Sequence, residues 1–441
     1  MDKYTIKGRN KLTGTATVSG AKNAALKALV AACMTDEEVI IHNVPLISDF
    51  FVMIEIMKDL GVDVTLSGHT VIVRARKFSH SSIPLDKAVL ARTSSMFIAP
   101  LLARTGEAII PNPGGCRLGA RPIDRTINGI KKMSVDITYH SEDGYFHAKS
   151  KGLKGVNYKF QKNTHTGTET MILAAVLAKG TTVLNNAAEE PEIDDIIGLL
   201  NKMGADVKRT AHRQITINGV DKLHGAEFTI SPDRIEVATF AIAAIITGGN
   251  IFIKDAHKAA IRDFLKELKK TGAGIELTDG GIRFYANGTL KAVNITTGIH
   301  PGFLTDWQAL WGVLMTQATG ETKIHETVFE NKLGYVEDLD RMGAEIKLYN
   351  PTVKHPEKVY NFNLADDKPE YFHAVKISGP TPLHNAIMTT LDIRAGAAVV
   401  LAALVAKGTS TIFGIEKLDR GYEDFEGRLT KLGANIKRTV E

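Results

Sequence analysis

The first candidate for chemistry is a cysteine in a glycine-rich segment. Cys116 follows Gly114 and Gly115, and Arg117 and Arg121 lie just after it. Glycines leave a thiol uncrowded, and nearby guanidinium groups favour the thiolate, which is the nucleophilic form of cysteine. The pattern therefore indicates a reactive cysteine, with an unreactive loop cysteine as the alternative.

A second candidate lies near the start of the chain, where small residues lead into a predicted helix. Lys22 and Asn23 fall in the first turn of that helix. The unpaired backbone amides and the positive end of the helix dipole attract anions at such a place. The pattern indicates an anion site or, as the alternative, a solvated lysine at a helix start.

Three arginines stand beside predicted buried helices or strands. Arg92 precedes one apolar helix, Arg394 opens another, and Arg420 follows a strand-like segment. An arginine in such a place needs a carboxylate or an anionic ligand. Each one alone fits a structural ion pair, but their matching positions in repeated segments suggest a shared anion-binding cleft.

An aspartate opens a further apolar segment. Asp306 precedes Trp307 and Gln308 at the predicted start of a helix. Aspartate is common as a helix N-cap, where its carboxylate accepts backbone hydrogen bonds. A general base is the alternative role, since a carboxylate can take a proton from a substrate hydroxyl.

Composition favours small anionic ligands. The 441-residue chain has 54 basic and 49 acidic residues, a net charge of +5, and 44% apolar residues. It has no run of basic residues, so neither nucleic acid nor a membrane is expected as a partner. Phosphate-loop, zinc-protease and serine-hydrolase motifs are absent, and the 14 histidines are scattered, so no metal site is predicted.

The cysteine count and the N-terminal segment indicate a cytoplasmic protein. Two cysteines in a chain of this length suggest a reducing compartment. Cys33 lies in an apolar helical segment and is expected in the core. The N-terminal residues show no signal-peptide pattern, and the most apolar stretch, residues 395–405, is shorter than the roughly 20 residues of a membrane span.

One phrase recurs six times and sets the organisation of the chain. Each copy reads as a helix end, a glycine able to take positive φ at the C-cap, and then a strand. The cap positions are Gly61, Gly204, Gly272, Gly343 and Gly433, and Ser134 stands at this position in the second copy. An Ala-rich helix and a short strand precede each copy. The interval is about 70 residues, apart from a longer last one. We therefore expect six α/β units, three per domain, with buried apolar helices and an insertion near residues 348–384.

Several phrases together resemble the UDP-N-acetylglucosamine enolpyruvyl transferase family, over essentially the whole chain. They are residues 19–24, 113–116, 119–122, 186–193, 232–236, 305–306, 326–331, 392–395 and 419–422. The resemblance implies an α/β fold known as the inside-out α/β barrel. It further implies one domain of residues 21–229, a second of residues 1–20 and 230–441, and substrates bound in the cleft between them.

The resemblance also implies a reaction and its residues. The enolpyruvyl group of phosphoenolpyruvate passes to the 3-hydroxyl of UDP-N-acetylglucosamine, the first committed step of peptidoglycan synthesis, without cofactor or metal. Lys22, Asn23, Arg121 and Arg420 would bind phosphoenolpyruvate, Asp306 would accept the hydroxyl proton, and Cys116 would protonate the methylene carbon. Residues implied in substrate binding also include Arg92, Pro122, Ile123, Asp124, Arg125, Val328, Asp392 and Arg394.

The sequence departs from the family pattern near the expected nucleotide site. Thr126 stands where a histidine is common, Lys332 where an arginine is common, and residues 162–167 replace a more apolar stretch. Two alternatives to the family reaction follow. One is an enolpyruvyl transferase with another nucleotide acceptor, and the other is a non-catalytic nucleotide-sugar sensor.

Overall fold

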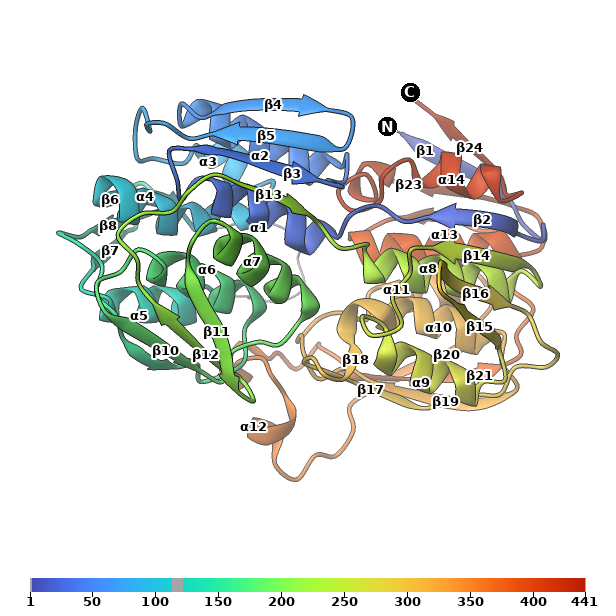
Figure 1. Ribbon diagram of the computed structural model, residues 1–441. Helices are drawn as coiled ribbons and strands as arrows, with labels where there is room; N and C mark the ends of the chain where they lie inside the picture. Colours follow the sequence, from blue (N-terminus) through green and yellow to red (C-terminus); the bar gives the residue numbers. More distant parts are fainter. Residues whose placement is uncertain (1, 113–121, 441) are drawn as a thin grey trace. The chain divides into compact units, whose positions relative to one another are not determined.

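The computed structural model describes residues 2–112 and 122–440 (Figure 1). Cys116, Arg117 and Arg121 lie outside the described residues. The described residues form two compact units. The first unit comprises residues 20–112 and 122–231, and the second unit comprises residues 2–19 and 232–440. The chain therefore starts in the second unit, builds the first, and returns.

The described strands of the first unit form three sheets. The first sheet has, in order, β13 (Ala226–Thr229), β3 (Glu38–His42), β5 (Thr70–Arg74) and β4 (Asp63–Ser67). The second has β6 (Glu107–Pro111), β8 (Tyr145–Lys149) and β7 (Asp136–His140). The third has β11 (Asp206–Ala211), β12 (Gln214–Asn218), β10 (Thr181–Asn185) and β9 (Asn157–Lys159).

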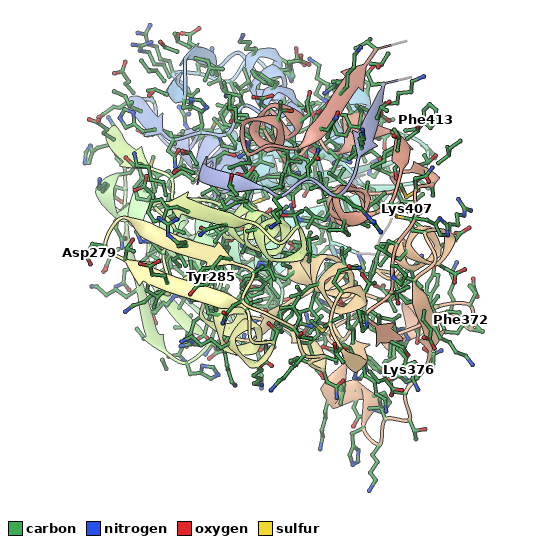
Figure 2. The ribbon with its side chains drawn as sticks, turned by 90° about the vertical axis from the view of Figure 1, so that its right-hand side faces the viewer. Asp279, Tyr285, Phe372, Lys376, Lys407 and Phe413 are labelled. Atoms are coloured by element: carbon green, nitrogen blue, oxygen red, sulfur yellow. The ribbon has the colours of Figure 1, made fainter. Side chains whose placement is uncertain are left out.

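The described strands of the second unit also form three sheets. The first has, in order, β15 (Gly274–Thr278), β16 (Gly281–Tyr285), β14 (Asn250–Lys254) and β2 (Thr13–Thr17). The second has β18 (Phe303–Leu304), β17 (Ile295–Gly298), β19 (Gly320–His325), β21 (Ala374–Gly379) and β20 (Glu345–Tyr349). The third has β22 (Ile387–Thr389), β23 (Thr409–Phe413), β1 (Lys3–Lys7) and β24 (Asn435–Thr439). Figure 2 marks the β15–β16 hairpin by Asp279 at its turn and Tyr285 at the end of β16.

One pattern of connections recurs in these sheets. In the third sheet of the first unit, β9 and β10 are parallel and are joined through the helix α6 (His165–Ala175). An antiparallel hairpin, β11–β12, then completes the sheet, with β12 against β10. A parallel pair needs such a helical crossover, whereas a hairpin needs only a short turn.

A buried helix accompanies each sheet. These inner helices are α1 (Lys22–Ala32), α4 (Ile98–Thr105), α6, α8 (Arg234–Ile246), α10 (Gln308–Thr316) and α13 (Ile393–Val405). In the second unit, α8, α10 and α13 contact one another, with the strands around them (Figure 1). Nearly every residue of these three helices is buried, so they are stable only inside the unit. The predicted inside-out arrangement is confirmed.

A second set of helices carries one polar face each. They are α2 (Ser48–Asp59), α5 (Asp124–Lys132), α7 (Pro191–Lys202), α9 (Arg262–Lys270), α11 (Tyr335–Arg341) and α14 (Phe425–Lys431). In α9, Phe264, Leu265 and Leu268 are buried, while the last turn carries Lys269 and Lys270. Cations suit the negative end of a helix dipole. No helix among the described residues has the length and apolar character needed to cross a bilayer.

The recurring phrase has the backbone conformation that the sequence predicts. The cap positions have positive φ angles in all six copies: Gly61, Ser134, Gly204, Gly272, Gly343 and Gly433. Ser134 is the exception in residue type, with φ of 67°. A residue with a Cβ is strained in this left-handed region, by roughly 1–2 kcal/mol.

Replacing Ser134 with glycine should therefore stabilise the protein, by about 1 kcal/mol. Denaturant unfolding of the full chain measures this gain. Gly272→Ala is the matched control with the opposite sign, because Gly272 has φ of 84° and the nearest atom to an added Cβ is 3.9 Å away. If Ser134→Gly lowers the stability, the serine makes a favourable interaction that outweighs its backbone strain.

The connection between β20 and β21 is long. Residues 350–373 join these two antiparallel strands and carry the short helix α12 (Pro356–Val359), on a loop that extends away from the strands (Figure 1). The loop has a small aromatic cluster, in which the rings of Tyr360 and Phe362 stack with centroids 4.9 Å apart. His373 packs against both rings. These contacts fix the base of the loop to its sheet.

Candidate active site

Asp306 is surrounded by cations in the second unit. It lies in the 3-10 turn η2 (Thr305–Trp307), directly before α10. The Nζ atom of Lys332 is 2.6 Å from its Oδ1, and the Nε atom of Arg394 is 3.9 Å from the same oxygen. The N-cap residue of η2 is Leu304 and that of α10 is Trp307, so Asp306 is the N-cap of neither. The N-cap alternative is therefore wrong, and the carboxylate belongs to an ion cluster.

The charge state of Asp306 follows from these neighbours. Burial alone would raise the pKa of its carboxyl, but Lys332 and Arg394 outweigh that effect and hold the pKa well below its usual value. Lys332 is nearly inaccessible, with 4% of its side chain exposed, whereas 23% of the Asp306 side chain is exposed. The result is a permanently ionised carboxylate that solvent can still reach.

The start of α13 holds the guanidinium of this cluster. Arg394 is buried, and its guanidinium lies 5.7 Å from the ring centre of Tyr422. The Tyr422 hydroxyl hydrogen-bonds to the Thr239 hydroxyl at 2.9 Å. Asp392 is the N-cap of α13, because its Oδ1 accepts from the amides of Arg394 and Ala395 at 2.7 and 3.1 Å. Asp392 thus acts on the helix start that carries Arg394.

Two other predicted residues of the second unit lie on connecting segments. The amide of Val328 donates to Oε1 of Glu326 at 2.8 Å. Glu326 is buried and also accepts from the Thr305 hydroxyl at 2.8 Å, so it ties the Val328 segment to the turn that carries Asp306. Arg420 is half-buried and follows the 3-10 turn η4 (Ile415–Lys417).

Lys22 is paired inside the first unit. It is the first residue of α1, and its Nζ atom lies 2.7 Å from Oδ2 of Asp49. Lys22 is 8% exposed and Asp49 is 5% exposed. The solvated-lysine alternative is therefore wrong. Asn23 is half-buried in the same turn. A buried ammonium at a helix N-terminus is a strong local attractor for an anion.

The remaining predicted residues of the first unit flank two other helix starts. Arg92 begins the 3-10 turn η1 (Arg92–Phe97), and its carbonyl accepts from the Ser95 hydroxyl at 3.1 Å. Four predicted residues lie at the beginning of α5; they are Pro122, Ile123, Asp124 and Arg125. The Tyr158 hydroxyl donates to the Arg125 carbonyl at 2.7 Å, which fixes the first turn of α5 to a neighbouring strand.

Three residues that lie at or beside the predicted site residues were not themselves predicted as site residues. Asp49 pairs with Lys22, Lys332 pairs with Asp306, and the Arg234 guanidinium lies 5.9 Å from the Trp307 ring. Arg234 sits in a phrase typical of the family and Lys332 at a position that departs from the family pattern, so both had a local signal, whereas Asp49 had none. The pairings of Lys332 and Asp49 join separate helices or loops, so no local pattern predicts them.

The other cysteine, Cys33, lies in the core of the first unit. Cys33 ends the inner helix α1 and is fully buried. Burial raises the pKa of its thiol to about 12. A thiol with that pKa is not nucleophilic near neutral pH. The prediction that Cys33 is a core residue is confirmed.

The unusual stretch of residues 162–167 has a structural role. Thr164 caps α6, since its hydroxyl accepts from the Gly167 amide at 3.2 Å. Nε2 of His165 lies 3.2 Å from one carboxylate oxygen of Glu169, and Nζ of Lys27 lies 3.1 Å from the other. Glu169 is completely buried. This ion triad, Lys27–Glu169–His165, joins α1 to α6 inside the first unit.

Known proteins resemble this chain along its whole length. The family model of EPSP synthase (3-phosphoshikimate 1-carboxyvinyltransferase) matches residues 6–429. The UDP-N-acetylglucosamine 1-carboxyvinyltransferase of Acidobacterium capsulatum is 40% identical over 443 residues, which cover 99% of this chain and 96% of the relative. The protein of the same name from Koribacter versatilis is 40% identical over 445 residues, covering 100% and 97%.

Solved structures share the fold. The enolpyruvyl transferase NikO from Streptomyces tendae superposes with a TM-score of 0.87 at 23% identity, over 100% of this chain and 99% of that one. EPSP synthase from Acinetobacter baumannii superposes with a TM-score of 0.75 at 18% identity, over 100% of both chains. Fold, family model and full-length identity agree, and the chain belongs to the UDP-N-acetylglucosamine 1-carboxyvinyltransferase family.

Proposed function

We propose that this protein transfers the enolpyruvyl group of phosphoenolpyruvate to the 3-hydroxyl of UDP-N-acetylglucosamine, with release of phosphate. The observation that carries the proposal is the ion cluster of Asp306, in a chain 40% identical to relatives named for this activity. The ionised, solvent-accessible carboxylate can accept the hydroxyl proton, and the buried cations beside it favour an anionic substrate. The reaction would commit UDP-N-acetylglucosamine to peptidoglycan synthesis.

In the proposed reaction, the 3-hydroxyl oxygen adds to C2 of phosphoenolpyruvate. The hydroxyl proton passes to Asp306, and C3 gains a proton from the Cys116 thiol. Phosphate then leaves C2 of the tetrahedral ketal, and the Cys116 thiolate formed in the addition takes a proton back from C3, which restores the double bond. Lys22, Arg121 and Arg420 would stabilise the charge that develops on the leaving phosphate.

Lys22 suits the proposed phosphate contact because its position is fixed before substrate arrives. Its pairing with Asp49 at 2.7 Å holds the ammonium at the N-terminus of α1. An incoming phosphate would then meet the ammonium at the positive end of the α1 dipole. Pre-positioned charge stabilises a transition state without reorganisation during the reaction.

Phosphate release tests the reaction directly. Phosphate should appear when phosphoenolpyruvate and UDP-N-acetylglucosamine are both present, and with neither substrate alone. Shikimate 3-phosphate in place of the nucleotide sugar is the control acceptor, because the matching family model is that of EPSP synthase. Turnover with shikimate 3-phosphate and none with the nucleotide sugar would contradict the proposal.

A panel of acceptors separates the two alternatives. Residues 162–167 take part in the cap of α6 and in the ion triad, so their difference from the family pattern has a structural use in this chain. Other UDP-sugars should therefore be poorer acceptors than UDP-N-acetylglucosamine. Faster turnover with another nucleotide sugar would favour a changed acceptor, and nucleotide-sugar binding without any turnover would favour a sensor.

Cys116 is the expected target of an anionic epoxide that mimics phosphoenolpyruvate, such as fosfomycin. The neighbouring arginines Arg117 and Arg121 should lower the pKa of its thiol below the free value of about 8.5. Peptide mass mapping should place the adduct on Cys116 and leave the buried Cys33 unmodified. Cys116→Ser should lose both the inactivation and most of the activity. An adduct on Cys33, or a fully active Cys116→Ser, would refute this role.

A further inference from the structure

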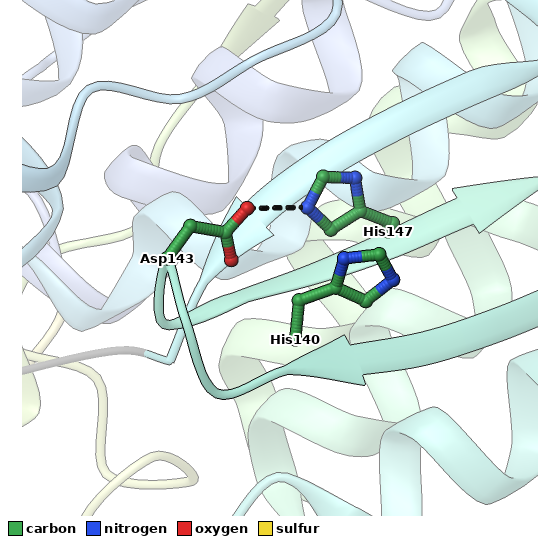
Figure 3. Close-up of side chains that lie close together, drawn as sticks. All are labelled: His140, Asp143 and His147. Carbon is green, nitrogen blue, oxygen red and sulfur yellow. Dashed lines mark hydrogen bonds and ion pairs between the residues drawn. The ribbon is translucent and has the colours of Figure 1, made fainter.

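Two histidines and an aspartate meet on one face of a hairpin in the first unit. His140 ends β7, His147 lies in β8, and Asp143 lies in the turn between them (Figure 3). One ligand atom from each residue lies within 4.8 Å of the other two. No metal-binding motif marks this spacing in the sequence, because only the hairpin brings the three side chains together.

The hairpin register puts both imidazoles on the same face. Thr138 is opposite His147, and His140 is opposite Tyr145, so the two histidines are diagonal neighbours. Their rings stack with centroids 4.1 Å apart and planes inclined by 21°. On its other side, β8 pairs with β6, so His147 stands on the central strand of the sheet. The imidazoles therefore project from a rigid base.

Asp143 is already oriented for a ligand role. Its Oδ1 accepts from the Tyr145 amide at 2.9 Å, and its Oδ2 is 2.8 Å from Nε2 of His147. The backbone bond holds the carboxylate in place, as outer-shell hydrogen bonds do for metal-bound carboxylates. A metal about 2.1 Å from each ligand atom needs those atoms roughly 3–3.5 Å apart. The Asp143–His147 pair, at 2.8 Å, is close to that spacing, and the ligand atom of His140 lies within 4.8 Å of the other two, so a bound ion would have to draw the His140 ring closer.

We infer that this hairpin is a binding site for a divalent transition-metal ion of the zinc type. Two imidazoles and one carboxylate are the ligands that Zn²⁺, Co²⁺ and Ni²⁺ favour, whereas Mg²⁺ and Ca²⁺ prefer oxygen atoms alone. His140 and Asp143 are exposed and His147 is half-buried. The ion can therefore enter from solvent, and water completes its coordination.

A bound metal would hold the turn of the β7–β8 hairpin against the ends of its two strands. The Asn112 amide, just after the end of β6, donates to the Gly144 carbonyl in the same turn at 3.2 Å. Three ligands from the hairpin would hold Asp143 and both strand ends together, so the turn would open less often. Because a metal that binds only the folded chain stabilises it by mass action, binding should also raise the thermal midpoint.

Calorimetric titration of the untagged full chain with Zn²⁺ tests the site. We expect about one equivalent to bind at the hairpin, and His140→Gln and His147→Gln each to weaken this binding by at least about tenfold. His257→Gln is the matched control, because His257 is an exposed histidine of the second unit outside the cluster. It should leave the binding isotherm unchanged. Circular dichroism should show the same fold for all variants.

A second readout reports the ligands themselves. Co²⁺ added to the wild-type chain should give visible absorption bands that both histidine variants lose and that Mg²⁺ does not displace. Equal Zn²⁺ binding by the wild type and both histidine variants would overturn the inference. So would wild-type protein that binds neither Zn²⁺ nor Co²⁺, since the cluster would then be a solvated hairpin with an Asp143–His147 hydrogen bond and nothing more.

Discussion

Asp306→Asn should lower the turnover number by about 10²–10⁴-fold, which is the usual contribution of a general base. Asparagine keeps the shape of the side chain but accepts a proton poorly. The phosphate-release assay measures this loss. The Michaelis constants should change much less, because the substitution removes a proton acceptor and keeps the space. Turnover within about threefold of the wild type would show that Asp306 is not the base.

The pH profile of the same reaction tests the cluster around Asp306. Lys332 and Arg394 hold the pKa of this carboxyl well below its usual value of 3.8, so Asp306 is ionised at every pH above that value. Wild-type kcat/KM should therefore show no acid limb from Asp306 above pH 4. In Lys332→Met the pKa of the carboxyl should rise, and an acid limb should move to higher pH.

Lys332→Arg is the control for that profile. It keeps a positive charge beside the carboxylate, so its acid limb should stay where the wild-type limb is. The family resemblance implies an arginine at this position, which makes Lys332→Arg the natural charge-keeping substitution. If Lys332→Met and Lys332→Arg give the same profile, the charge of residue 332 does not set the ionisation of the base.

The second large effect concerns stability. Glu169→Gln should destabilise the protein by about 3–5 kcal/mol, because it leaves Lys27 buried without a counter-charge. Lys27 is 5% exposed and Glu169 is 0% exposed, so water cannot replace the lost carboxylate. Denaturant unfolding of the full chain measures the loss in stability. Substrates are left out, because a ligand that binds the folded chain would raise its apparent stability.

Glu227→Gln is the matched control for this loss. Glu227 also pairs with a histidine, His42 at 2.7 Å, but 68% of its side chain is exposed. Solvent-exposed ion pairs contribute about 0–1 kcal/mol, so this variant should differ little from the wild type. The double variant Lys27→Met/Glu169→Met should be more stable than Glu169→Gln, because no buried ammonium remains. A double variant as unstable as Glu169→Gln would assign the loss to packing.

The ion triad also gives the stability a pH dependence. Burial lowers and Glu169 raises the pKa of His165, with a net rise above 6.5. The stability that the His165 ion pair contributes is present below pH 6.5 and is lost as the pH rises through the pKa of His165 in the folded protein. Burial raises and His165 and Lys27 lower the pKa of Glu169, with a net fall below 4.5. That contribution is present above pH 4.5 and is lost as the pH falls through the folded pKa.

Local patterns predicted most of the fold. The helix-end phrase depends on a residue that tolerates positive φ, and five of its six copies use glycine, so the repeat is legible in the sequence. Ala-rich segments without a polar face predicted the inner helices, because a helix that is apolar all round must be buried. The aromatic cluster of Tyr360, Phe362 and His373 was not predictable, because its members meet only after the loop returns to its sheet.

The candidate site was predictable in residue types and less so in pairings. Lys22 was placed correctly in the first turn of a helix, but its burial depends on Asp49 from the next helix. For Asp306 the sequence left both a helix cap and a general base open. Its contact with Lys332, distant in the chain, removed the first role. Hairpin register, which a spacing search does not capture, brings His140 to His147.

The position of β1 has a consequence for how the chain folds during synthesis. β1 lies between β23 and β24, so residues 3–7 leave the ribosome early but meet both neighbours only when residues 409–439 have emerged. Residues 20–231 complete the first unit well before that. Tyr4 and Ile6, fully buried in the finished sheet, therefore stay unpaired through most of translation. Closing so long a loop makes this sheet the slow, aggregation-prone step of folding, and the stage at which a chaperone has most to protect.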